Sequence, residues 1–280
     1  MLLRFFCLLS LVLSTVLNLL LGAFESYTWL WMLPLIALAC LLVCLLLAFL
    51  LLVIMASRVD LNKEQEKDSK AYRKVTEMYL EAALPVIRWD IKTKGMDKVP
   101  HDGRFLLVCN HVSLADPIVL LRVFSGHQVA FISKRENQTM FLIGKFMHKL
   151  LCQPINREND REALKTIIKC IQIIKDDKAS IGVFPEGYIH EDRKLHHFRS
   201  GVFKIAQKAE VPIVVCTLKN TRHAISNLLH FKYTPIEASV LEVIPAAELK
   251  GQHTTDIAQR VYEIMAADLG PENVSQEENA

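Results

Sequence analysis

The chain has 280 residues, of which 51% are hydrophobic and 22% are charged, and its formal net charge is +3. It is more apolar than an ordinary soluble domain, and the excess lies near the N-terminus. Because the modest positive charge includes no long basic run, we expect no nucleic-acid partner.

Two stretches near the N-terminus, residues 5–24 and 29–56, contain no charged side chain. A helix needs roughly 20 apolar residues to cross a bilayer core, so either stretch can span a membrane. A cleaved signal peptide is the alternative for the first stretch, because Arg4 precedes it, but its apolar run exceeds the roughly 7–15 residues of a signal-peptide core. We therefore predict a membrane anchor of two transmembrane helices over residues 1–56.

The charges around these stretches predict their orientation. The connection "ESYT" is short and acidic, whereas basic residues flank the outer ends, namely Arg4, Arg58, Lys63 and Lys67. Since positive flanks stay in the cytosol, both ends of the hairpin are expected there. Residues 57–280 would then face the cytosol, where the basic flank suits an anionic membrane surface.

The remaining chain predicts one α/β domain. Residues 57–84 mix charges with apolar side chains and suggest an amphipathic connecting helix, residues 85–270 alternate strands with helices, and residues 271–280 form a polar tail. The expected strands are "VIRWDIK", "RFLLVC", "QVAFIS", "CQPIN", "SIGVF", "PIVVCTL" and "EASVLEVI". Several are continuous apolar runs, which indicates strands buried on both faces. We predict a mixed, largely parallel sheet flanked by helices and preceded by the membrane hairpin.

Polar clusters follow several of these strands, where open α/β sheets place their sites. The first is "NHVSLADP", with His111 after a buried strand and Asp116 five residues later. Asp116 followed by Pro117 is typical of a helix N-terminus, so a capping role would account for the aspartate. It leaves His111 unexplained, and an imidazole held by a carboxylate at one nitrogen can take a proton at the other.

Two further clusters are candidates for substrate binding. In "FPEGYIHEDR", Pro185 and Gly187 predict a tight turn that holds Glu186 at a strand end. Lys134 and Arg157 each follow a strand, and an arginine can grip a phosphate through two parallel hydrogen bonds. Solvent-exposed turn and surface positions are the plainer interpretation of all three charged residues. The histidines after "FPEG" match no helical metal-ligand spacing, so we expect no metal.

Together these motifs resemble a known family. "NHVSLADP" is similar to the N-H-x-x-x-x-D motif of glycerolipid acyltransferases, and "FPEG" to their F-P-E-G motif, in the same order and about 70 residues apart. "FISKRE", "PINRE" and "FRSGVFKIAQKAEVPIVVCTLKN" resemble the segments around them. The resemblance covers roughly residues 85–225 and is strongest to the 1-acylglycerol-3-phosphate (lysophosphatidic acid) acyltransferases.

The resemblance implies a role for each matched position. His111 would be the general base and Asp116 the residue that orients it. Acceptor-binding roles would fall to the other four matched residues, namely Lys134, Arg157, Glu186 and Gly187. It further implies phosphatidic acid synthesis from a membrane lipid acceptor and an acyl thioester, either acyl-CoA or acyl carrier protein, with no cofactor.

Two alternatives stay open at this point. Tyr188 and Ile189 stand where the family usually has Thr or Ser and then Arg, and Val215 replaces a common proline, so the acceptor could be glycerol-3-phosphate, another lysophospholipid or a lyso-aminolipid. A membrane hydrolase that uses His111 and Asp116 on water is the alternative from another class of enzyme. A nucleophilic serine in G-x-S-x-G, which many hydrolases need, is absent from the sequence.

Overall fold

The computed structural model describes residues 2–156 and 158–276, which divide into two compact units, residues 1–62 and 63–280. The first unit is a helical hairpin of α1 (Leu2–Leu20) and α2 (Trp29–Ser57). By length and composition, both helices are long and apolar enough to cross a membrane.

The hairpin has its polar residues inside. The buried residues of α1 are Ser10, Ser14 and Asn18, which recur every four positions, whereas most of its leucines are exposed. The Ser14 hydroxyl donates to the Leu33 carbonyl of α2 over 2.7 Å. A water-soluble hairpin would bury the leucines instead, and small polar residues between apolar helices are typical of pairs packed in lipid.

The second unit contains a seven-stranded sheet in the order β1-β7-β6-β2-β5-β3-β4. Every neighbouring pair is parallel except β6 and β7, so the predicted mixed, largely parallel sheet is confirmed. The strands are β1 (Trp89–Lys94), β2 (Leu106–Cys109), β3 (Val129–Lys134), β4 (Gln153–Ile155), β5 (Ser180–Val183), β6 (Ile213–Lys219) and β7 (Thr234–Ile244). Each lies within two or three residues of a segment expected from the sequence.

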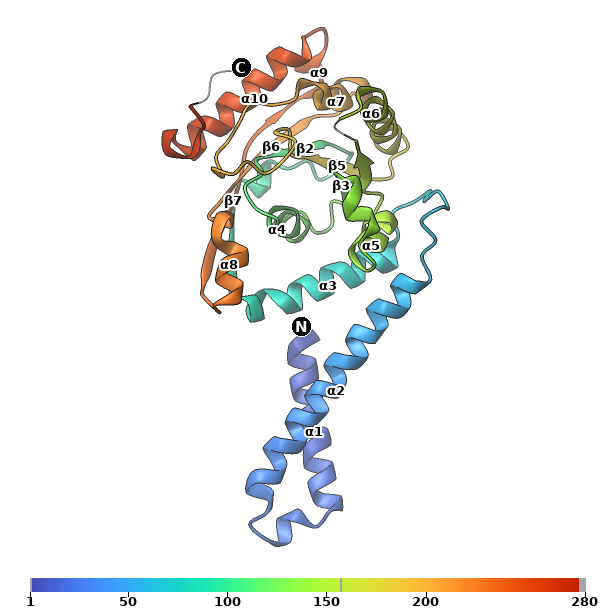
Figure 1. Ribbon diagram of the computed structural model, residues 1–280, viewed down its shortest axis with the longest axis vertical. Helices are drawn as coiled ribbons and strands as arrows, with labels where there is room; N and C mark the ends of the chain where they lie inside the picture. The colour runs from blue at the N-terminus through green and yellow to red at the C-terminus, as the bar shows by residue number, and fades with distance from the viewer. Residues whose placement is uncertain (1, 157, 277–280) are drawn as a thin grey trace. The chain divides into compact units, whose positions relative to one another are not determined.

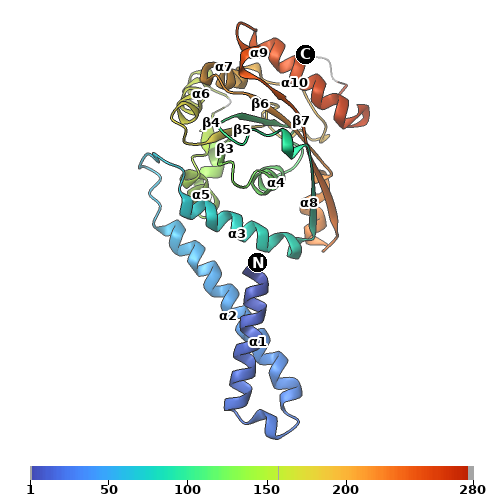
Figure 2. The ribbon, with the colours of Figure 1, turned by 180° about the vertical axis from the view of Figure 1, so that it is seen from behind.

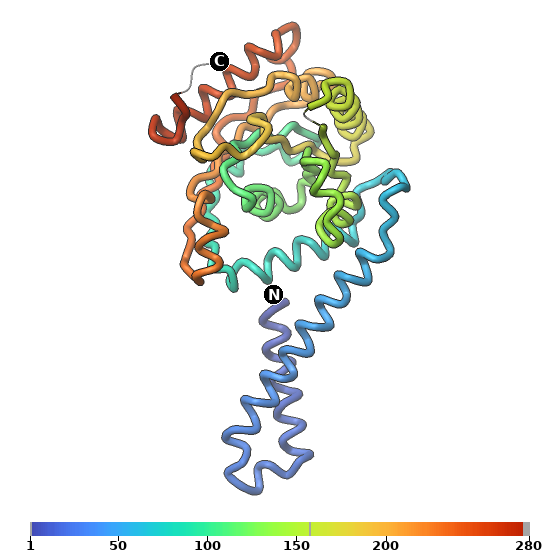
Figure 3. Tube along the Cα trace, viewed as in Figure 1, coloured from blue at the N-terminus to red at the C-terminus, as the bar shows by residue number. Residues whose placement is uncertain are grey.

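Helices cover both faces of this sheet (Figures 1 and 2). They are α3 (Lys70–Ile87), α4 (Asp116–Val123), α5 (Ile143–Lys149), α6 (Asp160–Lys175), α7 (Lys204–Ala209), α8 (Ala224–Leu229), α9 (Ala246–Leu249) and α10 (Thr254–Leu269). One face carries α6, α7, α9 and α10, and the other carries α4 and α8, with α3 against α4 and α5 (Figure 3).

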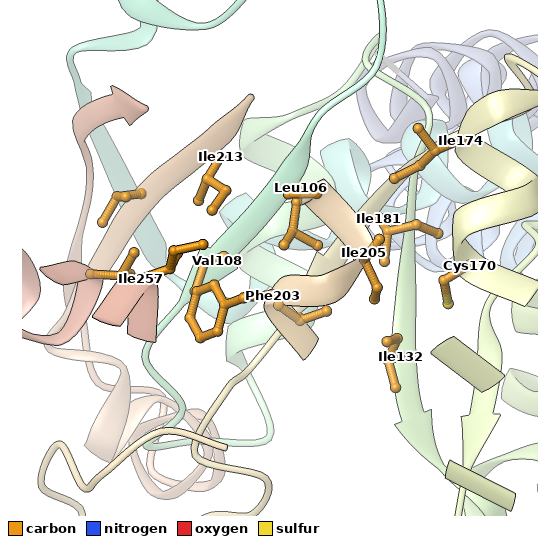
Figure 4. Packing of buried hydrophobic residues seen from close by; sticks show 14 of the residues in the cluster. Leu106, Val108, Ile132, Cys170, Ile174, Ile181, Phe203, Ile205, Ile213 and Ile257 are labelled. Atoms are coloured by element: carbon orange, nitrogen blue, oxygen red, sulfur yellow. The ribbon is translucent and has the colours of Figure 1, made fainter. Parts of the chain in front are cut away.

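Strand β2 shows how one segment serves two cores. Its alternate residues Leu106 and Val108 face the cluster with α6, α7 and α10, which Figure 4 shows from close by. Leu107 and Cys109 face the cluster with α4. All four are fully buried, because a central parallel strand is covered on both sides, and this explains its continuous apolar sequence.

The structure corrects the predicted connecting helix over residues 57–84. Helix α2 continues to Ser57, residues 58–69 form no helix, and α3 starts only at Lys70. The intervening "RVDLNKEQEKDS" has too few apolar side chains to bury one helical face, which explains its irregular path. At the other end α3 passes Pro85 and stops at Arg88, whose backbone is left-handed.

Candidate functional site

The site lies beyond the carboxyl end of β2, between the ends of its parallel neighbours β5 and β6. Asn110 fastens the loop that follows β2. Its side-chain amide donates to the Leu218 carbonyl of β6 over 3.0 Å, and its side-chain oxygen accepts the Leu218 N–H over 2.8 Å. This two-bond contact in a buried position fixes where the next residue, His111, leaves the sheet.

His111 and Asp116 form a hydrogen-bonded pair. Their Nδ1 and Oδ2 atoms are 3.0 Å apart, and the Asp116 side chain is completely buried. The same Oδ2 accepts the backbone N–H groups of Val112 and Ser113, each over 2.8 Å. One carboxylate oxygen therefore both shapes the loop and holds one nitrogen of the imidazole.

The predicted N-cap role of Asp116 is wrong. Helix α4 begins at Asp116 itself, Ala115 already has helical torsion angles, and no side chain caps the helix. The aspartate instead turns back onto the residues that precede the helix. Because the carboxylate is committed to the loop and to His111, capping no longer accounts for an aspartate at this position.

The imidazole of His111 packs flat on Phe184. Their ring centroids are 4.1 Å apart with the planes 20° apart, and Phe184 in turn stacks on Phe131 at 5.9 Å. Within the described residues, Nε2 of His111 has no hydrogen-bond partner, and the side chain is still 14% exposed. A ring fixed on one side by an aromatic residue and at Nδ1 by a carboxylate presents Nε2 for proton transfer.

Glu186 holds the loop from the neighbouring strand end. Its Oε1 accepts the N–H of His111 over 2.6 Å, and its Oε2 accepts the N–H of His196 over 3.1 Å. The predicted turn around it is confirmed, since the Gly187 N–H donates to the Phe184 carbonyl over 3.1 Å and Gly187 has a positive φ of 91°. The side chain is only 2% exposed, which favours positioning of the loop over direct contact with a substrate.

Two cavities adjoin this arrangement. The apolar cavity, about 530 Å³, is lined by Phe184, Pro185 and Gly187 of the turn and by residues of β3 to β5 and α6, including Ile132, Ile155, Leu164, Ile167 and Val183. Arg199 and Lys204 add positive charge to its lining. The polar cavity, about 560 Å³, is lined by Asn110 and Val112, which flank His111, together with Arg193, Lys219, Arg222 and Asp268.

Lys134 and Arg157 are the other two charged residues that the sequence predicted for the site. Lys134, at the end of β3, is mostly exposed, and its ammonium group lies 3.1 Å from the Glu136 carboxylate. Arg157 lies outside the described residues. The structure thus brings together His111, Asp116 and Glu186, with Gly187 in the adjoining turn.

One participant was not expected from the sequence. The guanidinium of Arg193 donates to the Val112 carbonyl over 2.8 Å, although the two residues are 81 positions apart. Arg193 ends the polar cluster "FPEGYIHEDR", but nothing in that run of letters distinguishes it from an exposed arginine. The contact depends on how residues 185–199 fold back over the loop.

The histidines beyond the turn form a stack and not a chelate. The rings of His190 and His196 lie 3.4 Å apart and nearly parallel, and His196 bonds Asp192 over 2.9 Å. Parallel rings at this distance do not aim their nitrogens at a common point. Among the described residues, no group of three or more His, Cys, Asp or Glu side chains is arranged to hold a metal ion.

A histidine at a strand end, held by a buried aspartate within an α/β domain, is the arrangement of an enzyme site for acid–base catalysis. Residues 90–219 match the model of the Acyltransferase family, so this segment is an acyltransferase-family domain. The chain also resembles a solved structure, that of the 1-acyl-sn-glycerophosphate (LPA) acyltransferase of Thermotoga maritima. The TM-score is 0.61 at 20% sequence identity, and the match covers 81% of this chain and 89% of that one. At this identity the likeness concerns the fold.

Curated relatives match over part of the chain. A probable 1-acyl-sn-glycerol-3-phosphate acyltransferase of Mycoplasma pneumoniae is 37% identical over 40% of this chain and 43% of its own length. A chloroplastic 1-acyl-sn-glycerol-3-phosphate acyltransferase of Brassica napus is 33% identical over 49% of this chain and 39% of its own length. The chain therefore spans about two-fifths of the length of these relatives.

The buried Glu186 generates a prediction about pH. Burial raises the pKa of its carboxyl to about 8 from an ordinary value of 4.5, against the opposing effect of the two N–H bonds. A raised pKa in the folded state means that folding favours the protonated carboxyl of Glu186. The contribution of Glu186 to the free energy of unfolding is therefore full below about pH 4.5 and is lost as the pH rises to about 8. The loss in unfolding free energy approaches about 1.4 kcal/mol per pH unit within that window.

Glu186→Gln should remove this dependence, since the amide does not titrate. Thermal unfolding of the detergent-solubilised chain from pH 5 to pH 8.5 should show the variant gaining stability relative to the wild type as the pH rises. Glu191→Gln, an exposed glutamate of the same segment, is the control and should follow the wild type. Parallel curves for wild type and Glu186→Gln would show that Glu186 does not titrate with a raised pKa.

Proposed function

We propose that this protein transfers a fatty acyl group from an acyl thioester to the free hydroxyl of 1-acylglycerol-3-phosphate, giving phosphatidic acid in phospholipid biosynthesis. The observation that carries the proposal is the His111–Asp116 pair within a domain of the acyltransferase family. The names of the curated relatives support the acceptor.

The geometry supports a direct transfer. Nε2 of His111 takes the proton of the acceptor hydroxyl as its oxygen attacks the thioester carbon. The tetrahedral intermediate then collapses, the C–S bond breaks, and the thiolate takes the proton from the imidazolium. Asp116 stabilises the imidazolium through its bond to Nδ1, and a positioned base of this kind contributes about 10²- to 10⁴-fold. No acyl-enzyme is required.

The two cavities suggest where the substrates bind. The apolar cavity fits a fatty acyl chain, because its walls are largely aliphatic side chains. We assign the acceptor phosphate to Lys134, at the end of β3, and to Arg157, which the sequence places shortly after β4, with Gly187 permitting close approach at the turn. Glu186 acts by holding the backbone of His111 and not by touching the acceptor, since it is almost fully buried and bonds two backbone N–H groups.

The test of this function is lipid analysis after incubation of the purified full chain with lysophosphatidic acid and acyl-CoA, and separately with an acylated acyl carrier protein as donor. The wild type should form phosphatidic acid, and His111→Ala should lose activity by about 10²-fold or more while it still folds. His253→Ala, which replaces an exposed histidine at the start of α10, is the control and should stay fully active.

Other outcomes of the same assay would contradict the proposal in different ways. The protein could transfer the acyl group to glycerol-3-phosphate, another lysophospholipid or a lyso-aminolipid, but not to lysophosphatidic acid. That result would keep the proposed acyl transfer and contradict only the proposed acceptor. The half-exposed Tyr188 and the neighbouring Ile189 are the residues to examine in that case. Release of free fatty acid without transfer would indicate a hydrolase, and full activity of His111→Ala would remove the mechanism.

We further propose that the hairpin spans the membrane twice and that residues 57–280 lie on the cytoplasmic side, where acyl thioesters are made. The support is the basic flank of Arg58, Lys63 and Lys67 against the acidic connection "ESYT". Protease added to intact cells should leave the domain uncut, and the same protease should digest it after the cells are lysed. Digestion of the domain in intact cells would contradict the proposed orientation.

A further inference from the structure

Arg193 adopts a conformation that an arginine rarely takes. Its φ is +57°, in the left-handed region where glycine and asparagine are favoured and where a long side chain is held at a cost. Its side chain is half-buried, and the guanidinium reaches the Val112 carbonyl over 2.8 Å. A strained backbone that delivers a charged donor to one particular carbonyl suggests that the contact has a purpose.

That carbonyl belongs to the segment that carries His111. Asp116 already holds the N–H groups of Val112 and Ser113, and Glu186 holds the N–H of His111. The peptide group between Val112 and Ser113 is therefore fixed at its N–H by Asp116 and at its C=O by Arg193. Without Arg193, the C=O side has no other hydrogen-bond donor among the described residues.

We propose that Arg193 is a positioning residue, which fixes the Val112 peptide and so keeps the imidazole of His111 aligned with the reacting hydroxyl. This inference rests on the proposed acyl transfer. The segment that begins with the Glu186 turn grips the loop at two points, the His111 N–H and the Val112 carbonyl. A displacement of about 1 Å at a catalytic group can cost on the order of 10²-fold in rate, so a freed peptide matters to catalysis far more than to folding.

The strain provides a way to separate positioning from ordinary stabilisation. Arg193→Gly removes the backbone strain together with the hydrogen bond, so the unfolding temperature should be unchanged or higher, while kcat falls about 10- to 100-fold with little change in KM. Arg193→Lys keeps a cationic donor on a long side chain and should recover part of the lost kcat. A residue with a merely structural role would lose stability and activity together.

Glu210→Gly is the matched control. Glu210 also has a positive φ of 57°, at the end of α7, and it is exposed. Its replacement should relieve strain in the same way and leave kcat at the wild-type value. If Arg193→Gly is as active as Glu210→Gly, Arg193 does not position the loop, whereas the proposed function stands.

Hydrogen exchange provides a readout that does not depend on activity. Mass spectrometry of the full chain in detergent micelles should show faster exchange in peptides covering residues 110–116 of Arg193→Gly, but not of Glu210→Gly or the wild type. Faster exchange there would show that Arg193 holds the loop even if the acyl-transfer assay failed in every variant, including the wild type, which would refute the proposed function alone. Unchanged exchange in residues 110–116 would overturn the inference.

Discussion

The site depends on one buried carboxylate oxygen. Oδ2 of Asp116 accepts hydrogen bonds from two backbone N–H groups of the loop after β2 and from Nδ1 of His111. The same atom therefore determines both the shape of the loop and the orientation of His111. A buried carboxylate is costly unless it is well bonded, and these three donors offset that cost. Displacing this oxygen would disturb the path of the chain and the histidine together.

The rest of the site holds the same loop from other directions. Asn110 ties its start to β6, Glu186 binds the His111 N–H from the turn after β5, and Arg193 binds the Val112 carbonyl. These contacts come from segments that only a parallel sheet brings to one edge. Two of them carry a cost, the burial of Glu186 and the left-handed backbone of Arg193, which is expected where structure serves function more than stability.

The sequence predicted the fold and the contact between His111 and Asp116 because their signals are local. Continuous apolar runs such as "SIGVF" mark buried strands. The role of Arg193 could not be predicted, because it depends on a backbone torsion and a contact between distant segments. The predicted cap role of Asp116 was wrong because an aspartate before a proline is typical of a helix N-terminus, whereas here the carboxylate bonds the residues that precede the helix.

The central claim, that the charge of Asp116 supports the imidazole, can be separated from its effect on the loop by Asp116→Asn. The other carboxylate oxygen, Oδ1, is buried without a hydrogen-bond partner among the described residues. The asparagine amide can therefore place its oxygen at the Oδ2 position and its nitrogen at the Oδ1 position. All three bonds then survive without the charge. Since a hydrogen bond to a charged group is worth about 1–1.5 kcal/mol more than one between neutral groups, kcat for acyl transfer should fall about 5- to 12-fold while thermal unfolding stays near the wild type. A folded Asp116→Asn protein with the wild-type kcat would contradict the account.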